Sequence, residues 1–213
     1  MKKLLAIVLV MAMLCSLTAC GEFVLFREKK PLQVKRVFPR GTIEGRNYEN
    51  QLIGIGFKRR DDWTYFSDER IKELDEATLQ VIDAEERAEL KKADMVYDMV
   101  AADQKRLSSI NVIAYDSLKA AALKINTDYE SQIPGLEKTL RDMGYGSIKC
   151  EVTTVVLGGK EVSGLKITAG IAGKRMEQVC ICLRCKGYWA TITIATFDED
   201  NLQDLLDAFY WLE

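Results

Sequence analysis

The chain has 213 residues, which is enough for one domain with a full hydrophobic core. Its hydrophobic share of 48% is ordinary and excludes both a disordered chain and a polytopic membrane protein. The formal net charge is −2 and no basic patch carries interleaved aromatic residues, so nucleic acid is not an expected partner. The sequence contains no histidine, which excludes Ser-His and Cys-His nucleophile pairs and the commonest zinc sites. We therefore expect a non-enzymatic protein without a cofactor.

The first twenty residues have the pattern of an export signal. Lys2 and Lys3 precede an apolar run over residues 4–14, which is too short to span a membrane comfortably. Leu17-Thr18-Ala19-Cys20 then resembles a bacterial lipobox, the motif read by prolipoprotein-processing enzymes. That resemblance implies a signal peptide over residues 1–19, a diacylglycerol thioether on Cys20 and, in many bacteria, a further acyl chain such as palmitate on its amine. The alternative is an ordinary signal peptide whose cleavage site ends near a cysteine.

A lipid on Cys20 would hold the mature chain on the cell membrane, facing outside the cytoplasm, because two or three acyl chains bind a bilayer firmly. Residues 20–40 show no clean period, and we expect a lipidated N-terminus followed by a tether. The cations of this segment are Arg27, Lys29, Lys30, Lys35, Arg36 and Arg40. They are either solvated along the tether or lie against anionic headgroups, where each contributes about 1 kcal/mol.

A single domain is predicted over residues 41–213. Its first elements are, in chain order, short extended pieces over 41–48, a strand over 52–58, a helix capped by Ser67, and a hairpin of strands over 95–102 and 110–115. Thr127 and Glu130 form a capping box that starts a second helix, which should end at Gly144. Pro134 lies inside that helix and predicts a kink or a short break.

The stretch from residue 148 to 197 predicts a four-stranded antiparallel meander. Its strands are Ile148–Leu157, Glu161–Gly170, Lys174–Cys185 and Tyr188–Phe197. The joints between them are short and carry glycine, which favours hairpins over crossovers. Asp198 then caps a last helix, which would present Leu202, Leu205, Leu206, Phe209 and Leu212 on one face.

Several short motifs relate this order of elements to a known family. They are Asn47-Tyr48-Glu49-Asn50, Gly54-Ile55-Gly56-Phe57, Asp62-Trp63, Tyr129, the Gly158-Gly159-Lys160 turn and the Gly187-Tyr188 turn. With them the chain resembles lipoproteins of Firmicutes that are similar to the PsbP family of photosystem II, whose fold is shared by Ran-binding Mog-type proteins. Over about residues 41–213 the resemblance implies an α/β fold of the α+β type, a PsbP-like αβα sandwich in which helices pack on the faces of an antiparallel β-sheet. It also implies a binding or assembly factor, with no partner or site residue carried over.

Four cysteines remain in the domain beyond the lipidated one: Cys150, Cys180, Cys182 and Cys185. An exported chain with four cysteines suggests two disulfides. In the predicted meander, however, Cys150 lies opposite Ile167 and two strands from Cys180, at roughly 9.5 Å or more, which is too far for a disulfide. The favoured interpretation is free, partly buried thiols. The alternatives are a structural disulfide, or a redox or soft-metal site built from Cys180, Cys182 and Cys185.

Aromatic and acidic residues supply the remaining candidates. Trp63, Tyr65, Trp189 and Trp211 would form a partner surface if they remain exposed together, and packing in the core is the alternative. Asp198-Glu199-Asp200 does not have the spacing of a calcium loop and suits a helix N-terminus. Asp61-Asp62 is interpreted as a pair of solvated turn carboxylates instead of an acid/base pair.

These observations predict a lipid-anchored, extracytoplasmic domain that binds a protein or another envelope partner or supports envelope assembly. The alternative function is a thiol-dependent redox or soft-metal-handling lipoprotein that uses Cys180, Cys182 and Cys185.

Overall fold

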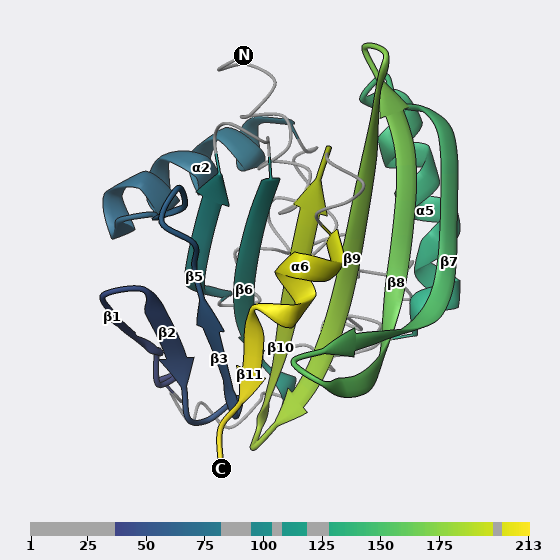
Figure 1. Cartoon of the computed structure of the whole chain (residues 1–213). Helices are drawn as coiled ribbons and strands as arrows, with labels where there is room; N and C mark the ends of the chain where they lie inside the picture. Colours follow the sequence, from purple (N-terminus) through teal and green to yellow (C-terminus); the bar gives the residue numbers. More distant parts are fainter. Residues whose placement is uncertain (1–36, 82–94, 104–107, 119–127, 198–201) are drawn as a thin grey trace, which may run out of the picture.

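The computed structural model describes residues 37–81, 95–103, 108–118, 128–197 and 202–213, and its strands form two antiparallel sheets (Figure 1). The larger sheet has the strand order β4-β5-β6-β10-β9-β8-β7. In that order its strands are Thr64–Tyr65, Val96–Asp103, Ser108–Asp116, Tyr188–Thr196, Lys174–Cys185, Lys160–Ile171 and Gly146–Leu157. The smaller sheet has the order β1-β2-β3-β11, with strands Thr42–Glu44, Asn47–Asn50, Ile55–Lys58 and Phe209–Trp211.

The predicted meander is confirmed as strands β7 to β10. Residues with positive φ occupy all three joints, at Gly158-Gly159, Ala172-Gly173 and Gly187, as two-residue hairpin turns require. Cys150 pairs with Ile167 as predicted, and Ile167 in turn pairs with Gln178 of β9. The β5–β6 hairpin is also confirmed, and its connecting residues 104–107 lie outside the described residues.

The main core lies on one face of the seven-stranded sheet, which we call the small-sheet face. The small sheet and helix α6 (Leu202–Asp207) pack on this face, as Figure 1 shows. Alternate strand residues such as Ile110 on β6 and Ile192 on β10 meet Phe57 of β3 and Trp63 there, all less than 3% exposed. Because successive side chains of a strand point to opposite faces, the residues between them belong to the other face.

The other face of the large sheet, the helix face, carries helices α2 (Asp68–Val81) and α5 (Tyr129–Asp142). Leu136 and Leu140 of α5 pack on β8 and β9, and Ile71 of α2 packs on β5. The predicted fold class, an antiparallel sheet with packed helices, is confirmed. Helices α2 and α5 occupy only one face, however, since the small sheet and α6 cover the other.

The residues at the two ends of α5 explain where this helix begins and where it ends. The N-cap is Asp128, whose carboxylate accepts from the Glu130 N–H at 3.3 Å, whereas Thr127 of the predicted capping box lies outside the described residues. At the C-terminus the Gly144 and Tyr145 N–H groups donate to the carbonyls of Arg141 and Leu140, the pattern of a Schellman motif with Gly144 at φ +86°. The helix is continuous across Pro134, so the predicted break is wrong.

The prediction of a long last helix is wrong in its second half. Helix α6 ends at Asp207, and Phe209–Trp211 form β11, which pairs with β3. Three consecutive aromatic residues suit a strand, and β3 offers them an open edge. The Tyr210 ring lies over Gly56, where an added Cβ would be 2.3 Å from the ring. Asp198-Glu199-Asp200 lies outside the described residues.

The packed domain begins before the predicted boundary at residue 41. The Phe38 side chain is 6% exposed and its ring contacts Tyr188 edge-on, with centroids 5.2 Å apart. Arg40, expected in the tether, pairs with Asp68 at 2.9 Å. Residues 1–36, with the predicted leader, Cys20 and most of the tether, lie outside the described residues. None of the described helices has the length and apolar character that crossing a membrane requires.

The β7–β8 hairpin curls away from the rest of the large sheet. The β8–β9 pairing ends at Leu165 and Cys180, and the Tyr129 hydroxyl lies in the gap that follows. It accepts from the Cys182 N–H at 2.7 Å and donates to the Ser163 carbonyl at 3.4 Å. The curled hairpin then reaches α6, where the Gly158 N–H donates to the Leu206 carbonyl. The curl makes the small-sheet face concave beside β7 (Figure 1).

Candidate ligand-binding groove

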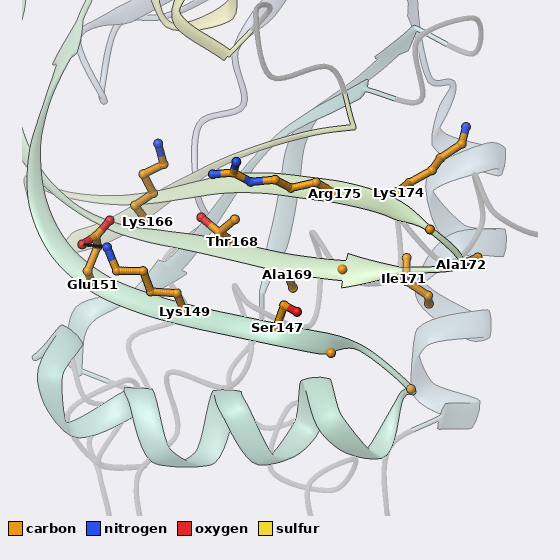
Figure 2. A pocket seen from close by; sticks show the side chains of 14 residues that line it. Ser147, Lys149, Glu151, Lys166, Thr168, Ala169, Ile171, Ala172, Lys174 and Arg175 are labelled. Carbon is orange, nitrogen blue, oxygen red and sulfur yellow. Dashed lines mark ion pairs between the residues drawn. The ribbon is translucent and has the colours of Figure 1, made fainter.

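An open groove of about 690 Å³ lies on β7, β8 and β9 at the end of the strands that carries the β8–β9 turn. Figure 2 shows Lys166, Thr168 and Arg175 projecting from the strands on the side away from α5. This is the small-sheet face, beyond the reach of the small sheet itself. Side chains that line the groove include Ser147, Lys149, Glu151, Lys166, Thr168, Lys174 and Arg175.

The strand register builds this groove from residues far apart in the sequence. Lys149 pairs with Thr168, and Thr168 pairs with Glu177, so the three form one cross-strand row. Glu151 and Lys166 form the adjacent row. Since paired residues project to the same face, the two rows present charged groups around a floor of small residues.

Two local backbone features shape the rim of the groove, one at the β8–β9 turn and one on β7. Ala172 and Gly173, both at positive φ, turn β8 into β9 and leave Lys174 and Arg175 at the start of β9. On β7 the register shifts between Gly146 and Lys149, where Ser147 has φ 49°. Such a bulge redirects the side chains that follow it. Neither the bulge nor the groove was predicted from the sequence.

Ion pairs hold three of the groove's cations, Lys149, Lys166 and Arg175, in place. Glu177, only 8% exposed, accepts from Lys166 at 3.3 Å and from Arg175 at 3.1 Å. Lys149 pairs with Glu151 at 2.6 Å, and this hydrogen bond lowers the pKa of the Glu151 carboxyl. Counted over the described residues, four cations against two carboxylates give the groove a formal charge of 4 − 2 = +2, although the chain as a whole carries −2.

The cysteines do not form the proposed metal or redox site. Cys150, Cys180, Cys182 and Cys185 are free thiols. Cys180 packs on the helix face with α5, whereas Cys185 packs in the main core on the opposite face. The odd spacing between them causes this separation. Among the described residues no group of three or more potential metal ligands converges.

The environment of the thiols suits apolar packing. Burial raises the pKa of Cys150 and of Cys182 to about 11, so both thiols are protonated at neutral pH. A protonated thiol is a poor nucleophile and a poor metal ligand. The geometry therefore supports the interpretation of free, partly buried thiols.

The four aromatic candidates do not form one surface. Trp63 is 2% exposed in the main core, and Tyr65 packs beside it. Trp211 donates to the Leu157 carbonyl at 2.9 Å and lies under Lys160. Trp189 lies on the helix face beneath Arg184. The predicted partner surface is therefore wrong, because these rings are divided between two faces and a core.

The acidic pair at Asp61-Asp62 does not form an acid/base site either. Asp61 pairs with Arg46 at 2.6 Å, and both side chains are more than half exposed. The groove was missed because three of its cations, Lys149, Lys166 and Arg175, are far apart in the sequence. Only the register of β7, β8 and β9 reveals that they share a face.

Comparisons with known proteins find similarity among solved structures alone. No protein-family model matches the chain, and no curated protein matches it. Among solved structures the chain is similar to LpqN of Mycobacterium tuberculosis, a protein involved in cell envelope biogenesis, at 13% identity and a TM-score of 0.35. The similarity covers 75% of this chain and 83% of that one. A similarity of this size does not extend to function, and the resemblance to the PsbP family stays a prediction.

Proposed function

We propose that this protein is a non-enzymatic lipoprotein, anchored on the cell membrane and facing outside the cytoplasm, that binds an envelope component in its β7–β9 groove. The observation that carries the proposal is Leu17-Thr18-Ala19-Cys20 behind a basic and apolar leader. The groove supports binding because it is concave, open and lined by oriented polar groups from three strands.

The anchor is tested by replacing its cysteine. In cells fed an alkyne analogue of palmitate, the wild-type protein should acquire the label and remain with the membrane fraction. Cys20→Ser should lose the label and keep the uncleaved leader, because the thioether forms on that sulfur. Cys15→Ser, a change inside the leader, is the matched control and should behave as wild type. A labelled, normally processed Cys20→Ser protein would overturn the proposal.

The groove is tested by photocrosslinking in intact cells. A benzophenone amino acid at Thr168 lies inside the groove, and the same residue at Thr154 lies on the exposed side of β7, which faces away from it. Envelope material should crosslink from position 168 and not from position 154. Equal yields from the two positions would contradict binding in the groove.

No observation favours the thiol-dependent function, since the three cysteines are divided between opposite faces.

A further inference from the structure

We infer that the ligand of the groove is an extended polyanion, a chain with several phosphate or carboxylate groups, bound at the end of the domain that carries the β8–β9 turn. This inference rests on the proposed function and names the chemistry of its ligand. It is carried by the charge, the rigidity and the length of the groove.

The charge of the groove is opposite to that of the molecule. The cations Lys149, Lys166, Lys174 and Arg175 surround it, and in the part of the chain that the structure describes two carboxylates, those of Glu151 and Glu177, oppose them. Removal of residues 1–19 takes away Lys2 and Lys3, so the mature chain carries −2 − 2 = −4. A local excess of positive charge in a negative domain concentrates anions at that place.

The two central cations are held ready for a ligand. Glu177 is nearly buried and contacts both Lys166 and Arg175, so it fixes their side chains over the groove. The Lys166 ammonium has three N–H donors, and Glu177 accepts from it through one carboxylate oxygen. A ligand therefore meets oriented donors and loses less side-chain entropy on binding.

The spread of the cations matches a chain better than a single anion. Lys166 pairs with Val179, and Val179 lies five residues along β9 from Lys174. At about 3.3 Å per residue, the cations extend over roughly 17 Å. Lys149 on β7 adds a width of about 9.5 Å, or two strand spacings. One phosphate contacts only part of such a surface, whereas a linear polyanion can pair with several of its cations at once.

The test uses the full lipoprotein reconstituted in vesicles of phosphatidylcholine, titrated with fluorescent inorganic polyphosphate. We expect saturable binding that weakens as salt is added, with much weaker competition by inorganic phosphate than by unlabelled polyphosphate. The double variant Lys166→Gln/Arg175→Gln should bind about tenfold or more weakly. The matched control, Lys138→Gln/Arg141→Gln, removes two exposed cations from α5 and should leave the affinity unchanged.

Three outcomes would overturn the inference. They are no binding of polyphosphate, an equal loss of affinity in the α5 control, and loss of polyphosphate binding when anionic lipid is added to the same vesicles. The third would mean that headgroups occupy the groove. These outcomes differ from failure of the proposed function. If the groove binds a ligand of other chemistry, polyphosphate binding fails, but crosslinking from position 168 in cells still captures that ligand.

Discussion

At the scale of single residues, Tyr129 shows how one hydroxyl maintains an interrupted sheet. It bridges the Cys182 N–H and the Ser163 carbonyl at the place where β8 separates from β9. Burial, the largest cause, raises the pKa of this phenol, so the hydroxyl keeps its proton and can donate. The bridge thus joins β8 to β9 where their own pairing has ended.

Tyr129→Phe should therefore lower the free energy of unfolding by about 1–3 kcal/mol, because it leaves a backbone N–H and a carbonyl unpaired. Urea denaturation measures the change. Tyr210→Phe removes a hydroxyl that donates to the Glu49 carboxylate, so one group instead of two loses its partner, and it should cost less. An effect of Tyr129→Phe no larger than that of Tyr210→Phe would contradict the bridging role.

The buried thiols predict a distinct dependence on pH. Alkylation of the folded protein at Cys150 and Cys182 should accelerate only as pH approaches about 11, whereas unfolded thiols titrate near pH 9. Between these values the unfolded chain binds fewer protons than the folded one, so stability should fall as pH rises from about 9 to about 11. Mass spectrometry after timed alkylation checks the first statement. Rapid labelling of both sites at pH 8 would contradict it.

At the scale of elements, the pairing of β3 with β11 depends on a glycine that an aromatic ring covers. Gly56→Ala should cost about 1–3 kcal/mol, since its Cβ would overlap the Tyr210 ring and push β11 off the sheet edge. The matched control is Gly135→Ala in α5, where an added Cβ meets no atom within 4 Å. There the better helix propensity of alanine should raise stability by up to about 1 kcal/mol. Thermal unfolding should give a lower midpoint than wild type for Gly56→Ala and a higher midpoint for Gly135→Ala. Equal shifts of the two midpoints would contradict the prediction.

Elements formed by local patterns were predictable, and elements formed by distant partners were not. Glycine joints predicted the meander, and Ser67 and Gly144 mark the start of α2 and the end of α5 as expected. The Phe209–Trp211 strand was missed because leucines before it continue a helical period, and only the free edge of β3 selects the extended form. The groove was missed for a similar reason, because the register that joins Lys149 to Thr168 is a property of the folded sheet.

At the scale of the whole molecule, the two sheets share one core and should unfold together. Trp63 is buried between them, and Phe38 near the N-terminus and Phe209 near the C-terminus belong to the same cluster. Tryptophan fluorescence and far-UV circular dichroism should therefore give one common midpoint in urea. A fluorescence transition at clearly lower urea would mean that the small sheet melts by itself.

The amino-acid sequence by itself determined the predicted export and lipid signal, the hairpins and the class of fold, because each depends on residues that are neighbours along the chain. Only the tertiary structure decided which faces the side chains share. The fold places the candidate cysteines on opposite faces of the large sheet and separates the candidate aromatic residues. It also brings cations from three strands together in one groove. The physical reason is that alternation along a strand and register between strands act across distances that a local pattern does not record.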